Sequence, residues 1–123
     1  MKNAIQWFEI PVNDLERAKQ FYSQLLAIEM QDFKMEQLQM VLFPVEEGTV
    51  GGALCYHSEF YKPSHEGPLV YLNANPDMSP ALERLEGLGG QLIQPKTLIR
   101  EDLGYMALIQ DTEGNRVALM SQS

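Results

Sequence analysis

Cysteine and histidine, the residues that most often carry redox and metal chemistry, are scarce in this chain of 123 residues. The only cysteine is Cys55, and the only histidines are His57 and His65. A single cysteine cannot form an internal disulfide, so the fold does not depend on an oxidising compartment. Paired Cys-x-x-Cys motifs, Gly-rich phosphate loops and Gly-x-Ser-x-Gly elbows are also missing, which removes the usual signatures of redox, nucleotide and hydrolase chemistry.

Long apolar runs and clusters of basic residues are missing as well. The longest apolar runs, such as MVLF and GGAL, fall far short of the roughly 18 to 20 residues of a membrane span. Residues 1–14 lack the apolar core of a signal peptide, so we expect a cytoplasmic protein with no membrane partner. Seventeen acidic residues against nine scattered basic ones give a net charge of −8, and we therefore expect no nucleic-acid partner.

The residues that are present predict one domain, 1–123, that mixes helices and strands. The segment AIQWFEIPV is rich in aromatic and β-branched residues and predicts a strand over about 5–12. The following NDLERAKQFYSQLL has apolar residues at every third or fourth position, which predicts an amphipathic helix capped by Asn13 or Asp14. Three short strands are predicted next, at about 28–33, 38–45 and 50–57.

The same order of elements then repeats. A strand at 69–74, a helix within 75–90 and three strands at 91–99, 105–110 and 115–120 follow a polar loop. MVLFPVEEG (40–48) shares Met, Leu, Glu and Gly with MALIQDTEG (106–114), 66 positions later. We interpret this as an internal duplication, with unit one at about 1–57 and unit two at about 68–123. The predicted fold class is α+β, with two tandem βαβββ units forming a curved mixed sheet around a cleft.

Two motifs carry a resemblance to a known family. IPVNDLERAKQFYSQLL resembles the opening strand and helix of the vicinal oxygen chelate superfamily, and DTEGNRVALM resembles its closing turn and strand. That superfamily includes glyoxalase I, extradiol dioxygenases, fosfomycin-resistance proteins and bleomycin-binding proteins. WFEIPVNDLERAKQFY, GGAL, GPLVYL and DTEGN are similar to a branch described as related to lactoylglutathione lyase. The resemblance implies tandem βαβββ units around a cleft and a homodimer.

The resemblance also implies where a divalent metal would be bound. Enzymes of the superfamily hold it with His or carboxylate side chains from the first and fourth strands of each unit. Aligning the motifs places those four positions at Trp7, Ala53, Leu69 or its neighbour Val70, and Ala118. None of these side chains is a metal ligand, so we expect neither a metal nor another cofactor.

The same strands supply a candidate ligand site. Strand alternation places Trp7 and Glu9 on one face, with Tyr71 and Asn73 on the matching face of the second unit. An aromatic wall with a carboxylate suits a small aromatic or cationic ligand. Further contacts are expected from the strand end at His57, from Tyr61 and Lys62 in the loop at 59–68, and from Arg100 and Tyr105 in LIREDLGYM.

These observations favour a metal-free, homodimeric protein that binds a small molecule. Two alternatives remain open. One is a metal-dependent glyoxalase-like lyase, isomerase or dioxygenase, with a rebuilt metal site that uses His57 and Glu9. The other is a regulatory or partner-binding domain, in which Trp7 fills the cleft as part of the core.

Overall fold

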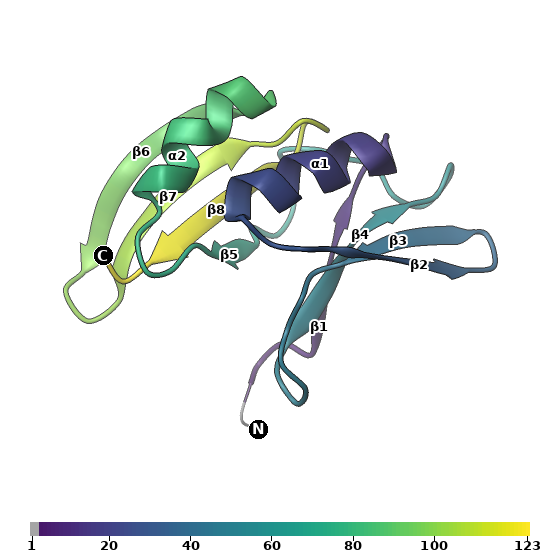
Figure 1. Cartoon of the computed structure of the whole chain (residues 1–123), viewed down its shortest axis with the longest axis horizontal. Helices are drawn as coiled ribbons and strands as arrows, with labels where there is room; N and C mark the ends of the chain where they lie inside the picture. The colour runs from purple at the N-terminus through teal and green to yellow at the C-terminus, as the bar shows by residue number, and fades with distance from the viewer. Residues whose placement is uncertain (1–2) are drawn as a thin grey trace.

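The first repeated unit forms a four-stranded sheet with one helix (Figure 1). The computed structural model describes residues 3–123. The strand order in this first sheet is β1-β4-β3-β2, with β1 parallel to β4 and the other pairs antiparallel. Its elements are β1 (Trp7–Pro11), α1 (Leu15–Leu26), β2 (Gln31–Met35), β3 (Leu38–Leu42) and β4 (Gly51–Tyr56).

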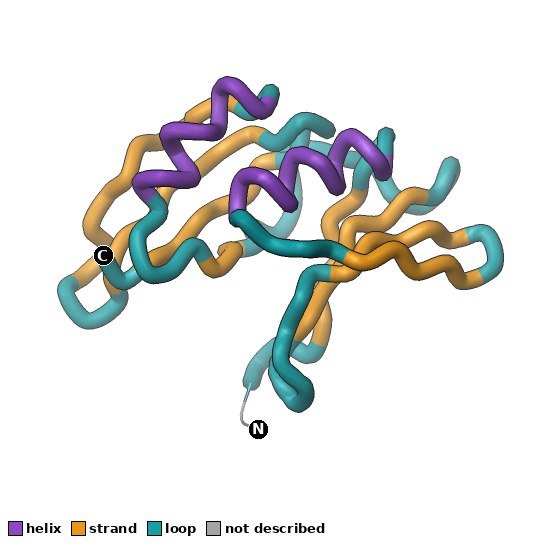
Figure 2. The backbone as a smooth tube through the Cα atoms, viewed as in Figure 1, coloured by secondary structure: helices purple, strands orange, loops and turns teal. Residues whose placement is uncertain are grey.

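The second unit repeats this arrangement (Figure 2). Its strand order is β5-β8-β7-β6, and β5 is parallel to β8. Its elements are β5 (Tyr71–Asn73), α2 (Ser79–Leu85), a 3-10 turn (Glu86–Leu88), β6 (Gln91–Arg100), β7 (Gly104–Gln110) and β8 (Arg116–Ser121). The predicted α+β class and the order of the two βαβββ units are confirmed.

The ends of several predicted elements differ from the structure, among them the strands predicted at 38–45 and 69–74, which are β3 (Leu38–Leu42) and β5 (Tyr71–Asn73). The strand predicted at 28–33 is β2, which starts only at Gln31. Ala27 closes α1 in the left-handed conformation (φ 54°), and the next residues carry the chain to the sheet edge, with Met30 buried on the way. The helix predicted within 75–90 begins at Ser79, where Pro80 fits the first turn, and Gly89 (φ 95°) ends the 3-10 turn that follows.

The register of the two sheets shows the duplication in space. Glu9 lies opposite Ala53 in the first sheet, and Tyr71 lies opposite Ala118 in the second. The separations, 62 residues from Glu9 to Tyr71 and 65 from Ala53 to Ala118, are those that the aligned motifs predict. The tight turns before β4 and β8 also correspond, because a glycine takes a positive φ in each, Gly48 in the first and Gly114 in the second.

Within residues 3–123, the strands form two sheets rather than one continuous sheet. β1 pairs with β4 along one edge and β5 pairs with β8, and neither strand has a second partner in this range. The outer edges of β1 and β5 therefore carry free N–H and C=O groups that another chain could pair with. Helices α1 and α2 contact each other along one side of the molecule (Figure 1).

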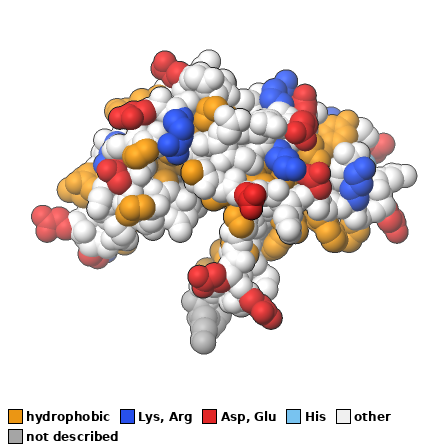
Figure 3. All heavy atoms as spheres, viewed as in Figure 1, with side chains coloured by type: hydrophobic (Ala, Val, Ile, Leu, Met, Phe, Trp, Pro, Cys, Tyr) orange, Lys and Arg blue, Asp and Glu red, His pale blue; other side chains and the backbone are white. Residues whose placement is uncertain are grey.

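The main core lies between the helices and one face of each sheet. The largest fully buried side chains come from both helices and both sheets, among them Phe21, Tyr22, Leu54, Leu85 and Leu119. Burial of apolar area on this scale is the dominant stabilising term for a domain of this size. The basic side chains visible in Figure 3 are separated from one another by acidic and apolar ones. No helix in residues 3–123 has the length and apolar character needed to cross a membrane.

The turn between β7 and β8 joins the two units through buried polar groups. Tyr22 Oη on α1 donates to Asp111 Oδ2 at 2.6 Å, and Asp111 also accepts from the backbone amides of Glu113 and Asn115, each at 2.8 Å. Asn115 Nδ2 donates to the carbonyl oxygen of Pro11 at 2.6 Å. The turn is thus fixed internally by Asp111 and tied to unit one at two points.

Asp14 is the N-cap of α1, and Glu113, in the β7–β8 turn, holds the segment around it from the other unit. Its Oε1 accepts from the backbone amides of Asn13 (2.9 Å) and Asp14 (2.7 Å), and its Oε2 accepts from Nε of Arg17 (2.7 Å). Burial by itself raises the pKa of Glu113, but the bonds from Arg17 and the Asp14 amide outweigh it, so the pKa lies below its usual value. Glu113 is therefore a charged, fully bonded link between the units.

Candidate functional site

The face of the first sheet turned away from the helices is the centre of the candidate site. Phe8 and Ile10 of β1 pack into the main core, so strand alternation leaves Trp7 and Glu9 on the opposite, open face. A small second cluster of buried side chains lies on this open face: Met40, Ala53 and Cys55.

Trp7, Glu9 and Tyr61 are connected by hydrogen bonds on the open face. The Nε1–H of Trp7 donates to Glu9 Oε2 at 3.3 Å, and the hydroxyl of Tyr61 donates to Glu9 Oε1 at 2.5 Å. The residue Trp7 keeps 44% of its surface exposed. A half-exposed indole beside a carboxylate is suited to holding a flat apolar or cationic group.

Cys55 lies directly below this group and is chemically quiet. It is fully buried in the second cluster, against Tyr61. Burial and the charge of Glu9 raise the pKa of the Cys55 thiol to about 12. The thiol therefore stays protonated at neutral pH and is a wall residue, because the thiolate is the nucleophilic form.

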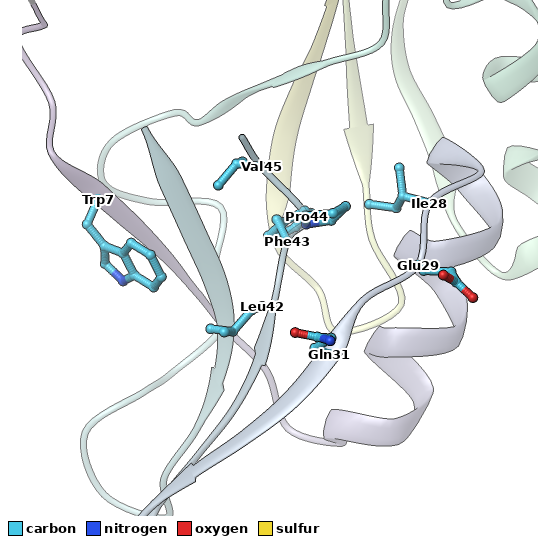
Figure 4. Close-up of a pocket in the computed structure, with 8 residues that line it drawn as sticks. All are labelled: Trp7, Ile28, Glu29, Gln31, Leu42, Phe43, Pro44 and Val45. Atoms are coloured by element: carbon cyan, nitrogen blue, oxygen red, sulfur yellow. The ribbon is translucent and has the colours of Figure 1, made fainter. Parts of the chain in front are cut away.

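A hollow of about 740 Å³ opens beside Trp7. Figure 4 shows the indole of Trp7 on one side of it and Ile28 on the other, with Leu42 and Pro44 between them. Gln31 and Glu29 supply the polar groups of its wall. The volume lies within the range of small-molecule sites, roughly 300 to 1,000 Å³.

A second hollow, of about 810 Å³, separates the two units. Phe8 of β1 and Leu72 of β5 both line it, together with most of the segment 43–50. Its lining is mostly apolar and comes in part from β1 and β5, which are each an edge strand of their sheet. An apolar groove lined by edge strands is typical of a surface that another chain covers.

The open face of the second sheet carries Tyr71 and Asn73. Tyr71 is 48% exposed, and Asn73 Oδ1 accepts from the backbone amide of Asn75 at 2.9 Å. Both residues line the groove between the units, while Trp7 and Glu9 lie on the first sheet. A single chain therefore presents the two predicted halves of the site on separate sheets.

Three other predicted ligand contacts lie apart from Trp7 and Glu9: His57, Arg100 and Tyr105. His57 uses Nδ1 to accept from the amide of Glu59 and stacks against Phe60. Arg100 is exposed and forms an ion pair with Asp102 in the β6–β7 turn.

Tyr105 belongs to β7, on the face that packs against the main core, and Lys96 Nζ lies 4.7 Å from the centre of its ring. The position of Tyr105 follows from strand alternation, because its neighbour Met106 pairs with Met120 on the open face of the second sheet.

Tyr61 contributes more to the site than the sequence indicates. The composition of its loop predicts a surface residue that could reach a ligand. In the structure its hydroxyl instead forms a hydrogen bond with Glu9, 52 positions away. Local pattern carries no signal for such a contact. The only hint is a tyrosine between polar residues and prolines, which is also common in solvent-exposed loops.

Comparison with known proteins identifies the family of this arrangement. The model of the Glyoxalase/Bleomycin resistance protein/Dioxygenase superfamily matches residues 4–119. The chain belongs to this superfamily. The predicted resemblance is thereby confirmed. No curated protein matches the chain.

Solved structures of the superfamily share the fold at low sequence identity. A mutant of glyoxalase I from Zea mays is 19% identical with a TM-score of 0.68, over 95% of this chain and 45% of the maize protein. This chain thus spans less than half of the maize enzyme. TnmS3, an antibiotic-binding protein from Streptomyces sp. CB03234, is 23% identical with a TM-score of 0.70, over 98% of this chain and 97% of its own. Hypothetical protein SA1046 from S. aureus is 20% identical with a TM-score of 0.66, over 98% of this chain and 95% of the S. aureus protein.

The positions at which the resemblance implies metal ligands carry no metal-binding side chain in this chain. Of the four positions that the resemblance implies, Ala53 and Ala118 occupy equivalent places on β4 and β8, Trp7 begins β1, and Leu69 lies just before β5. Indole is a hydrogen-bond donor only, and alanine and leucine offer no donor atom to a metal. Within residues 3–123, no group of three or more His, Cys, Asp or Glu side chains is arranged to hold an ion. The residues present do not fit the superfamily's metal.

Proposed function

We propose that this member of the superfamily is a metal-free small-molecule-binding protein whose ligand is aromatic and cationic. The observation that carries the proposal is Trp7. It stands at a position that resemblance assigns to a metal ligand, half exposed beside a hollow, with its N–H directed at the carboxylate of Glu9. The indole face would bind an aromatic ring, and Glu9 would orient a positive group.

The proposal includes a homodimer that completes the cleft. Support comes from the unpaired edges of β1 and β5 and from the apolar groove that both strands line. Pairing of these edges across two copies would bring the open face of one first sheet against the open face of a partner's second sheet. Trp7 and Glu9 would then face Tyr71 and Asn73 of the other copy, as one enclosed site requires.

TnmS3 supports the proposal, since it is an antibiotic-binding protein with this fold. The exposure of Trp7 also argues against the alternative in which its side chain fills the cleft as core. The cytoplasmic location and the absence of nucleic-acid and membrane partners stay predictions from the sequence.

A titration against Trp7 fluorescence tests the proposal, because Trp7 is the only tryptophan in the chain. Benzylammonium and toluene form a suitable pair of probes, since they share a ring and differ in the charged donor. We expect benzylammonium to quench Trp7 and to bind about tenfold more tightly than toluene, and Glu9→Gln to remove that difference. Light scattering after gel filtration of the same sample is expected to show two chains per particle.

Glu29→Gln is the matched control, because Glu29 is a carboxylate that lines the hollow and, unlike Glu9, accepts no hydrogen bond from Trp7. It should leave the preference for benzylammonium within about twofold of wild type. Equal affinities of wild type for the two probes, or no quenching by either one, would contradict the proposed ligand class.

A further inference from the structure

The loop between the two units places one side chain, Tyr61, on the open face of the first sheet. Its ring packs against Met40, Ala53 and Cys55, and its hydroxyl donates to Glu9 Oε1 at 2.5 Å. The other oxygen of Glu9 accepts from Trp7. Both oxygens of the carboxylate are therefore in use before any ligand arrives.

The loop itself is weakly attached to the rest of the fold. Within residues 3–123, the backbone of residues 57–63 makes no hydrogen bond to the backbone of another segment. The local bonds are those of Glu59 N to His57 and of Lys62 Nζ to the carbonyl of Ser58. Tyr61 is thus held in place by its own side chain, and moving it would break few other contacts.

The bond between Tyr61 and Glu9 is strong enough to discriminate between ligands. The hydrogen bond to Glu9, together with burial, raises the pKa of Tyr61 above its usual value, so the hydroxyl keeps its proton at neutral pH. A bond from a neutral hydroxyl to a carboxylate is charge-assisted. A neutral ligand gains nothing by replacing it, whereas an ammonium group forms a stronger bond in its place.

We propose that Tyr61 is the specificity-determining residue of the Trp7–Glu9 site. Its hydroxyl occupies Glu9 in the free protein and excludes neutral donors. A ligand with a charged N–H donor displaces it and takes over Glu9 Oε1, while a neutral aromatic ring binds at Trp7 without disturbing Tyr61. This inference rests on the proposed function and adds the residue that selects among ligands.

The variant Tyr61→Phe tests this role, because it removes the hydroxyl and leaves the ring on Cys55 and Met40. Glu9 Oε1 is then free, so we expect benzylammonium to bind about tenfold more tightly than to wild type, the value of one charge-assisted bond that no longer has to be broken. The affinity for toluene should not change. Tyr56→Phe is the matched control, since Tyr56 packs against the main core, and it should leave both affinities unchanged.

The outcomes separate this inference from the proposed function. Unchanged or weaker binding of benzylammonium to Tyr61→Phe, with wild type still binding it, would overturn the role of Tyr61 alone. An equal gain for both probes would also overturn it, because the ring rather than the hydroxyl would then be the obstacle. Absence of binding to wild type and to both variants would instead refute the proposed ligand site. Thermal unfolding of the variants confirms that each one is folded.

Discussion

Replacement of Glu113 by alanine is expected to lower the free energy of unfolding by roughly 3 kcal/mol, through loss of a buried, charged acceptor that holds the start of α1. The change leaves the amides of Asn13 and Asp14 without their acceptor and removes the partner of Arg17. Urea denaturation followed by circular dichroism measures the difference. Because Glu113 links the two units, the loss should affect the whole transition.

Glu47→Ala is the matched control for this prediction. Glu47 is the counterpart of Glu113 in the first repeat, but it is exposed, and the expected effect is below about 0.5 kcal/mol. Equal effects of the two substitutions would contradict the bridging role. The pH dependence gives a further check, because the folded pKa of Glu113 is lowered. Its stabilisation is complete above the unfolded carboxyl pKa of about 4.3 and is lost as pH falls through the folded value, so the gap between wild type and Glu113→Ala should shrink in acid.

Substitution of Gly104 by alanine is expected to cost about 4 kcal/mol, from left-handed strain and from a steric clash together. Gly104 has φ 85°, and a methyl group there would overlap the carbonyl oxygen of Ser121. That oxygen belongs to the backbone at the end of β8 and cannot move without distorting the β7–β8 pairing.

Gly48→Ala separates the two contributions to that cost. Gly48 has the same positive φ, but a methyl group there would have no neighbour within 4 Å. We expect a loss of about 1 kcal/mol, which is the backbone strain alone. The comparison is made by thermal unfolding of both variants. Similar losses at the two positions would show that the contact with Ser121 contributes nothing.

The features predicted correctly from the sequence are periodic or repeated. The spacing of apolar residues in NDLERAKQFYSQLL predicts α1, and the alternation in β1 predicts that Trp7 and Glu9 share a face. The repeated Met, Leu, Glu and Gly predict the equivalence of the two units, which the matching partners of Ala53 and Ala118 confirm. Each of these signals depends on residues close in sequence or on a copy of the same segment.

The features that the sequence does not reveal depend on contacts between distant segments. Glu47 and Glu113 are equivalent in the repeat, yet one is exposed and the other is buried against α1, 96 residues from Arg17. The contact of Tyr61 with Glu9 likewise depends on the path of an irregular loop. Local pattern sets which face a side chain takes, but not which segment covers it.

The metal content of the purified protein tests the metal-free cleft most directly. Tag-free protein is incubated with zinc, nickel, manganese and iron(II), freed of excess ions and analysed by elemental mass spectrometry. With Trp7, Ala53, Leu69 and Ala118 at the positions where the resemblance implies the metal ligands, we expect no retained ion. Retention of about one equivalent per chain, lost in a Glu9→Gln or His57→Gln variant, would contradict the proposal and point to a rebuilt metal site.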